Sequence, residues 1–160
     1  MNRLTIGLFL TLILFNVAAE QSLEDEVVWA SESDPIMKQA IKDARETLGS
    51  FLKKYKKNTP NTESYKLKVM ISDENGTEHF WIIPFTPLGN GKFQGTIANE
   101  PSLVKVVKFG QLFAFTEEMV SDWGYVEDGK QIGSFTICAL FKSMPKEQVE
   151  FYRKNHGFEC

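Results

Sequence analysis

The sequence has few of the side chains that most often perform catalysis or bind metals. Its 160 residues include two histidines and two cysteines, with no His-x-x-x-His or Cys-x-x-Cys spacing. That composition offers no recognised metal-ligand pattern. A Gly-x-Ser-x-Gly elbow is also absent, and the glycine-rich "PLGNGKFQG" lies between strand patterns, whereas a phosphate loop joins a strand to a helix. We therefore expect no metal, no cofactor and no classical hydrolase or nucleotide-binding motif.

The chain also lacks an excess of positive charge. It has 18 Lys and Arg against 21 Asp and Glu, a formal net charge of −3 at pH 7. No Lys/Arg stripe is interleaved with aromatic residues, so a nucleic-acid partner is disfavoured. The one basic cluster, "KKYKK" at 53–57, is typical of the solvated C-terminal end of a helix, where cations complement the helix dipole.

Long hydrophobic runs are confined to the N-terminus. "MNRLTIGLFLTLILFNVAA" has a basic start at Arg3, an apolar run over 4–17, and small residues at Val17 and Ala19. This pattern predicts a signal peptide over 1–19. The run is shorter than the roughly 20 residues of a membrane span, although an uncleaved anchor remains the alternative. We expect a periplasmic or secreted protein with no stable membrane span after cleavage, and a flexible lead over 20–33.

The two cysteines, Cys138 and Cys160, allow two interpretations. In an oxidising compartment they would form a disulfide closing a loop of about 23 residues, worth roughly 3 kcal/mol in the chain-entropy model. Alternatively, Cys138 is a buried free thiol and Cys160 belongs to a frayed tail. Spacing alone leaves both possibilities open.

The pattern after the lead predicts an α+β fold in a single domain over 34–160. Asp34 and Pro35 are typical of a helix start, and an apolar stripe follows to about residue 57. From Tyr65 the period changes to two, with short strands at hairpin spacing, the last of them over 132–141, "IGSFTICALF". A short C-terminal helix follows. We expect an antiparallel, strongly curved, partly barrel-like sheet of five or six strands, with the Phe-rich "QLFAFT" and "SFTICALF" as central strands.

The segment "DENGTEHFWI", 73–82, predicts a hairpin. With Asn75-Gly76 as the central pair of a two-residue turn, Met70 should lie opposite Trp81. The core face would then carry Leu67, Val69, Ile71, Phe80 and Ile82. The opposite face would carry Lys68, Met70, Ser72, His79, Trp81 and Ile83. Because a one-residue slip would bury Lys68 and Ser72, we expect these faces to be well specified.

Five short motifs occur in a characteristic order and spacing. They are "EHFW" (78–81), "FQGTIANEP" (93–101), "VVKFGQLFAF" (106–115), "SDW" (121–123) and "GSFT" (133–136). Together they resemble the YegJ-like bacterial domain, a family of unknown function, over about residues 65–140. The resemblance implies no reaction, ligand or catalytic residue. With an exported leader, it implies a location in the envelope of a Gram-negative-type cell.

We predict a candidate binding face around the mixed side of the hairpin. Its residues are His79, Trp81, Asn99, Asp122, Trp123 and Tyr125. Aromatic side chains with a few polar anchors suit a protein, peptide or glycan partner in the envelope. Asn99 is also typical of a turn, and Gly133 would leave room for a ring such as that of Trp123.

Three functions remain open on these residues. The leading hypothesis is a small non-catalytic binding or interaction module of the cell envelope. The second is a hydrolase-like enzyme with a His79–Asp122 acid–base pair, because imidazole can transfer protons near neutral pH. The third is a structural envelope protein, in which His79 is satisfied by Ser72, Asp122 or water and performs no chemistry.

Overall fold

The computed structural model describes residues 34–160, so the predicted signal peptide (1–19) and lead (20–33) lie outside the described residues. The elements, in chain order, are α1 (Pro35–Lys57), β1 (Thr62–Asp73), β2 (Gly76–Gly89), β3 (Lys92–Ile97), β4 (Leu112–Thr116), the 3-10 turn η2 (Glu117–Met119), β5 (Val120–Glu127), β6 (Lys130–Gly133), α2 (Phe135–Leu140) and α3 (Lys146–His156). No helix within 34–160 combines the length and hydropathy needed to cross a bilayer.

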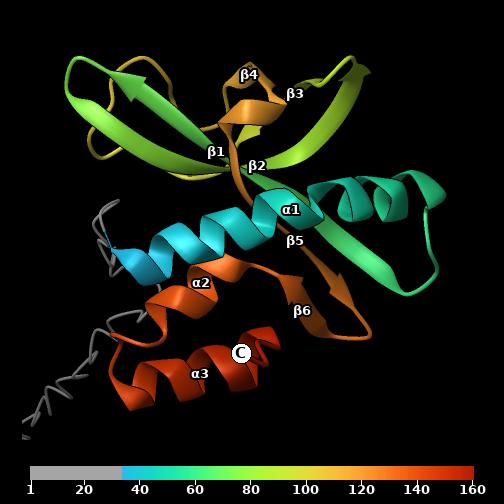
Figure 1. Ribbon diagram of the computed structural model, residues 1–160, viewed down its shortest axis with the longest axis vertical. Coiled ribbons are helices and arrows are strands. Elements are labelled where there is room, and N and C mark those ends of the chain that lie inside the picture. Colours follow the sequence, from blue (N-terminus) through green and yellow to red (C-terminus); the bar gives the residue numbers. More distant parts are fainter. Residues whose placement is uncertain (1–33) are drawn as a thin grey trace, which may run out of the picture.

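The predicted α+β fold class is confirmed. Six antiparallel strands form one sheet in the order β4-β3-β2-β1-β5-β6. The sheet curls without closing into a barrel. In Figure 1, α1 crosses the middle of the molecule, with β3 and β4 above it and α2 and α3 below it.

Helix α1 begins and ends where local sequence signals place it. The Asp34 carboxylate accepts a hydrogen bond from the Ile36 N–H at 2.9 Å, and Pro35 occupies the first helical turn, where its missing N–H costs nothing. Asn58 ends the helix in the left-handed conformation. The buried stripe consists of Ala40, Ala44, Leu48 and Phe51. Spaced by three or four residues, these side chains form one face against the sheet.

The β1–β2 hairpin has the predicted faces but a different turn. Its two central residues are Glu74 and Asn75, flanked by Asp73 and Gly76. Asp73 Oδ1 accepts the Asn75 N–H at 2.8 Å, a local bond that begins the turn one residue earlier than predicted. Gly76 takes the position after the turn with φ of +138°, which glycine adopts at little cost.

The predicted pairing of Met70 with Trp81 is therefore wrong, because Met70 lies opposite His79 and Lys68 opposite Trp81. The register differs from the prediction by two residues. Since side chains alternate with a period of two, this shift leaves every residue on its predicted face. The predicted core residues Leu67, Val69, Ile71, Phe80 and Ile82 are all at most 4% exposed.

The predicted last strand over 132–141 is only partly a strand. Strand β6 ends at Gly133, and helix α2 begins at Phe135 after Ser134, which has left-handed φ and ψ of 54° and 40°. The "QLFAFT" segment forms β4, which is an edge strand and not a central one. Its first residue, Leu112, is 60% exposed. Periodicity reports which face is apolar but not a strand's place in the sheet.

Helix α2 carries Cys138, which forms a disulfide with Cys160 across a Cα–Cα distance of 5.5 Å. Helix α3, the predicted short C-terminal helix, lies between these cysteines, with Pro145 before its start and Gly157 after its end. Of the two interpretations of the cysteines, the structure has the bonded one. The bond ties the C-terminus to α2.

The core is centred on stacked aromatic rings between α1 and the sheet. The rings of Phe51 and Trp123 lie 4.9 Å apart between centroids, and the Trp123 indole N–H donates to the Ala44 carbonyl at 2.9 Å. A methyl group on Gly133 would lie 2.5 Å from Trp123 Cε3. The glycine therefore makes room for the ring, which confirms its predicted role.

A buried carboxylate holds the long loop between β3 and β4. Glu78 is 8% exposed, and its oxygens accept N–H groups from Ser102, Leu103 and Val104 at 2.9–3.2 Å. Val104 in turn is fully buried in the core. Glu78 thus fixes this irregular loop against the sheet, because it accepts hydrogen bonds from backbone N–H groups that burial would otherwise leave unpaired.

Candidate functional site

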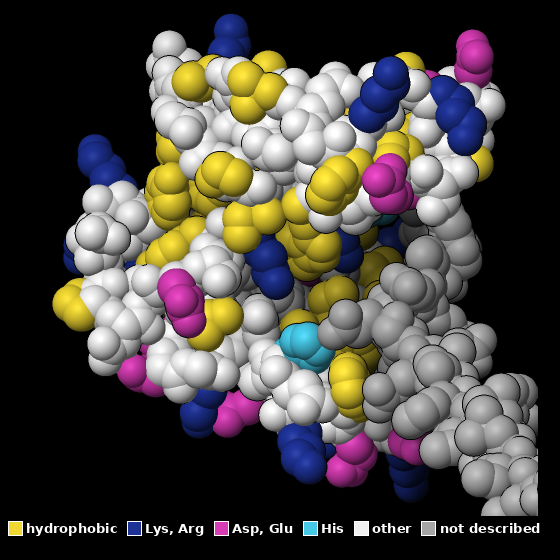
Figure 2. Space-filling view, turned by 180° about the vertical axis from the view of Figure 1, so that it is seen from behind, with side chains coloured by type: hydrophobic (Ala, Val, Ile, Leu, Met, Phe, Trp, Pro, Cys, Tyr) yellow, Lys and Arg dark blue, Asp and Glu magenta, His cyan; other side chains and the backbone are white. Residues whose placement is uncertain are grey.

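Two lysines and a tryptophan meet on the sheet face opposite the core. Lys66 and Lys68 alternate with the buried Leu67 on β1, and Trp81 lies opposite Lys68 on β2. The ammonium nitrogens lie 4.8 Å and 4.9 Å from the centroid of the Trp81 ring. All three side chains are half-buried. Figure 2 shows a hollow on the back of the molecule in which Lys or Arg side chains lie among hydrophobic ones.

A chain of hydrogen bonds connects Lys68 to the buried Asp122 on β5. Lys68 Nζ donates to Thr136 Oγ1 at 2.9 Å, and that hydroxyl donates to Asp122 Oδ2 at 2.6 Å. Lys68 and Asp122 are also directly opposite in the β1–β5 register. Thr136 is on α2, so this chain fixes the helix against the sheet beside the two lysines.

Asp122 is fully buried and functions as the cap of α2. Its carboxylate accepts hydrogen bonds from the backbone N–H groups of Phe135 at 3.1 Å and Thr136 at 2.8 Å. It also accepts the backbone N–H of the next residue, Trp123, at 2.8 Å. Burial raises the pKa of Asp122, although the Lys68 charge and these hydrogen bonds oppose that rise. Both oxygens of the Asp122 carboxylate therefore accept hydrogen bonds from other parts of the fold.

Burial has the opposite effect on the lysines. Desolvation lowers the pKa of Lys66 and of Lys68, because a charged ammonium is poorly solvated there, while the charge of Asp122 partly offsets this. The charge of Lys66 lowers the pKa of Lys68 further. Lysines with lowered pKa beside an aromatic ring are uncommon and often occur at functional sites.

His79 lies on the same sheet face, two residues before Trp81 on β2. Its Nδ1 is 2.8 Å from Ser121 Oγ. Ser121 is the bulged residue at the register shift between β1 and β5, where Lys68 pairs with Asp122 and Val69 with Val120. The bulge turns the serine hydroxyl toward β2, because a bulge redirects the side chain of the extra residue.

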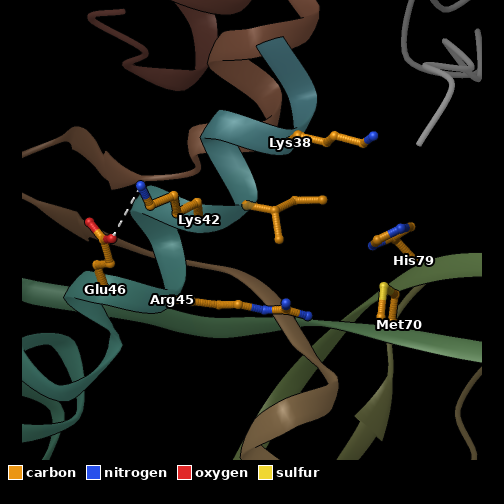
Figure 3. Close-up of a pocket in the computed structure, with 7 residues that line it drawn as sticks. Lys38, Lys42, Arg45, Glu46, Met70 and His79 are labelled. Carbon is orange, nitrogen blue, oxygen red and sulfur yellow. Dashed lines mark ion pairs between the residues drawn. The ribbon is translucent and has the colours of Figure 1, made fainter. Parts of the chain in front are cut away.

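A shallow pocket of about 390 Å³ opens beside His79. It is lined by Lys38, Ile41, Lys42, Arg45, Glu46, Met70 and His79. In Figure 3, Lys42 points toward Glu46, with which it forms an ion pair at 3.8 Å, while Lys38 and Arg45 extend toward the side of Met70 and His79. The Arg45 guanidinium donates to the Val120 and Glu118 carbonyls. The pocket therefore places cationic side chains of α1 beside His79.

The structure divides the predicted binding face between two sides of the sheet. Trp81 and His79 share one face, but Trp123 and Tyr125 are 7% and 5% exposed in the core. Trp123 and Tyr125 therefore cannot contact a partner, and their inclusion in the binding face is wrong. Asn99 has a structural role, since its Oδ1 accepts the Trp81 N–H at 2.9 Å.

The predicted His79–Asp122 acid–base pair is not formed. Asp122 is sealed by the donors of Trp123, Phe135 and Thr136, and His79 bonds the adjacent residue, Ser121. The bulge explains why the pair does not form. Ser121 is the extra residue between Val120 and Asp122, and its hydroxyl takes the place next to His79 that the prediction gave to Asp122.

Sequence reasoning missed Lys66, Lys68 and Thr136 as members of the site. The alternation in "YKLKV" already indicates that Lys66 and Lys68 share the Trp81 face, so the lysines could have been found from the predicted strand pattern. Thr136 could not, because the pattern of "GSFT" predicts a strand, whereas its helical conformation depends on Asp122, 14 residues earlier.

The chain is similar to bacterial proteins that are described as uncharacterised. A family model described as "Uncharacterized protein conserved in bacteria (DUF2314)" matches residues 34–160. The "Uncharacterized protein YegJ" of Escherichia coli (strain K12) is 34% identical over 148 residues, covering 92% of this chain and 95% of that protein. No solved structure matches the chain.

Proposed function

We propose a binding function for this chain, which belongs to the DUF2314 family of uncharacterised proteins conserved in bacteria. In this proposal it is a small, non-catalytic, exported module that binds a carboxylate-bearing protein, peptide or glycan. The binding face is formed by Lys66, Lys68 and Trp81, and we refer to these three residues as the lysine–tryptophan face.

The observation that carries the proposal is the convergence of two ammonium groups on one half-buried indole ring, at 4.8 Å and 4.9 Å. The chain as a whole is acidic, at −3, so this concentration of positive charge is local. Two like charges held together on a half-buried ring repel each other, and a bound anion would relieve that repulsion. Asp122 offsets only part of it.

A non-catalytic role fits the polar groups around the face. Asp122 is fully buried and accepts from four hydrogen-bond donors, and the Ser121 hydroxyl that His79 contacts is fully buried too, so neither the carboxylate nor that hydroxyl is open to a substrate. The aromatic ring and the basic pocket beside His79 instead offer contact surface with charged anchors.

An exported location fits two features. The N-terminal 1–19 segment has the pattern of a signal peptide. The Cys138–Cys160 disulfide is of the kind that persists in oxidising compartments such as the periplasm.

The test is binding of two acidic polymers, polyglutamate and polygalacturonate, to the purified protein by calorimetry. The Lys66→Gln/Lys68→Gln variant should bind at least about tenfold more weakly, and added salt should weaken wild-type binding. Preference for one polymer would identify a peptide or a glycan as the natural partner class. The matched control is Lys53→Gln/Lys56→Gln, which removes two exposed lysines from the end of α1.

An equal loss in the control pair would show that binding depends on net charge alone and would refute the proposed face. Failure of the wild type to bind either polymer would favour the structural-protein hypothesis. Circular dichroism of each variant ensures that only folded protein is compared.

A further inference from the structure

Lys66 and Lys68 touch the same ring but differ in what else they contact. Lys68 donates to Thr136 and lies opposite Asp122. Among residues 34–160 the Lys66 ammonium makes no hydrogen bond or ion pair, and its one specific contact is the Trp81 ring. Desolvation lowers the pKa of both lysines, but Lys68 has a hydrogen-bond partner, whereas Lys66 is a desolvated amine without one within this range, next to a second cation. That combination activates a lysine as a nucleophile.

A second polar group without a partner lies beside Lys66. Ser134 is fully buried, and its Oγ makes no hydrogen bond among the described residues. A methyl group placed on Gly124 would lie 2.7 Å from Ser134 Oγ and 3.2 Å from Lys66 Cε, so both groups flank the same glycine. An unpaired buried hydroxyl has a free-energy cost, which a ligand oxygen placed beside Lys66 would offset.

The backbone of Ser134 is also unusual. With φ of 54° it adopts the left-handed conformation, which is strained for a residue with a Cβ. The strain is tolerated because the Ser134 N–H bonds the Trp123 carbonyl at 2.7 Å and its own carbonyl starts α2. Strained residues of this kind are concentrated at functional sites.

We propose that the Lys66 amine forms a reversible imine with a small aldehyde that carries a carboxylate group. The inference goes beyond ionic binding, because it assigns a covalent step to one of the two lysines. The Lys68 ammonium attracts the carboxylate, the Trp81 ring packs against the carbon chain, and the Ser134 hydroxyl donates to the aldehyde oxygen.

The step balances without an oxidant or reductant. The lone pair of the unprotonated Lys66 Nζ forms a bond to the carbonyl carbon, while the C=O π electrons move to oxygen, which takes a proton. Nitrogen loses its protons as the C–O bond breaks, and the hydroxyl leaves as water. The products are one imine and one water, and hydrolysis reverses the reaction.

The experiment measures reductive labelling of the folded, full-length chain. Glyoxylate, a carboxylate-bearing aldehyde, is supplied with cyanoborohydride at neutral pH, and modified lysines are mapped by peptide mass spectrometry. Lys66 should be labelled at least about tenfold faster than the exposed Lys53 and Lys56, because more of its amine is unprotonated. Acetaldehyde, which lacks the carboxylate, should show a smaller advantage for Lys66.

Equal labelling of Lys66 and the two exposed lysines would overturn the inference. Denaturation in urea should remove the difference, which shows that the fold and not the local sequence causes it. The Lys66→Arg variant separates this inference from the proposed function. Arginine keeps the charge and should retain polyglutamate binding, but it cannot form the imine. If the wild type binds the polymer normally but its Lys66 is not labelled faster than the exposed lysines, only the imine is refuted and the proposed function stands.

Discussion

Lys68 and Asp122 face each other across β1 and β5, and the hydroxyl of Thr136 joins them by hydrogen bonds of 2.9 Å and 2.6 Å. The link joins β1 to two elements, β5 and α2, that come much later in the chain. It also fixes the lysine–tryptophan face relative to α2. Removing the bridging hydroxyl should therefore affect both stability and binding.

The first prediction concerns that hydroxyl. Thr136→Val keeps the shape of the side chain but leaves Lys68 and Asp122 without their common partner, which should lower the free energy of unfolding by about 1–3 kcal/mol. Urea denaturation checks the value. Thr136→Ser keeps the hydroxyl and should cost less than Thr136→Val, whereas equal losses would show that only the methyl packing matters.

Local signals made α1 and the hairpin faces predictable. The Asp34 cap, Pro35 and a stripe of period 3.6 all lie within the helix they specify. The two hairpin faces were predicted despite a register error of two residues, because the alternation repeats every second residue. The turn itself was mispredicted, because the Asp73 side chain competes for the turn backbone.

Features set by distant residues were not predictable. The segment after Gly133 is apolar enough for a strand, yet it is helical because Asp122 supplies the acceptor for its first N–H groups. Thr136 was missing from the predicted site for the same reason, since its helical position depends on Asp122. Burial of Trp123 was likewise missed, since α1 lies over it and no local pattern indicates which strand a helix covers.

The second prediction concerns Glu78 and the loop it holds. Glu78→Gln replaces the charged acceptor of three loop N–H groups and should destabilise the protein by about 2 kcal/mol. Amide hydrogen exchange at Ser102, Leu103 and Val104 should become faster than elsewhere. The control Glu100→Gln alters an exposed carboxylate in the same loop and should leave exchange unchanged. Protection that survives in Glu78→Gln would mean that packing of Val104 alone orders the loop.

The third prediction concerns pH and Lys66. Desolvation lowers the folded-state pKa of Lys66 below its value of 10.5 in the unfolded chain. Between those two pKa values the unfolded chain binds more protons, so this residue makes stability rise with pH. Lys66→Met should remove that contribution. Compared with wild type, the variant should therefore gain more stability at neutral pH than under alkaline conditions.

Urea unfolding from neutral pH to about pH 10 measures the difference between wild type and Lys66→Met. Lys53→Met is the matched control, since Lys53 is exposed on α1. The stability difference between Lys66→Met and wild type should shrink as pH rises, while that of the control stays constant. A constant difference for both variants would contradict the lowered pKa of Lys66.

The fourth prediction compares two glycines of the β5–β6 hairpin that share one backbone conformation. Gly129 and Gly133 have φ of +78° and +79°, so alanine pays a similar conformational cost at each, about 1–2 kcal/mol. A Cβ at Gly129 would meet nothing within 4 Å, whereas one at Gly133 would lie 2.4 Å from the Trp123 carbonyl oxygen and 2.5 Å from its ring.

The difference between Gly133→Ala and Gly129→Ala therefore isolates the contact with Trp123. We expect Gly133→Ala to be less stable than Gly129→Ala by at least about 2 kcal/mol, because neither the carbonyl nor the stacked ring can yield without disturbing Phe51. Indole fluorescence should shift in Gly133→Ala as the Trp123 ring is displaced. Equal stability of the two variants would mean that the ring moves aside freely, and the core around Trp123 would then be looser than its contacts indicate.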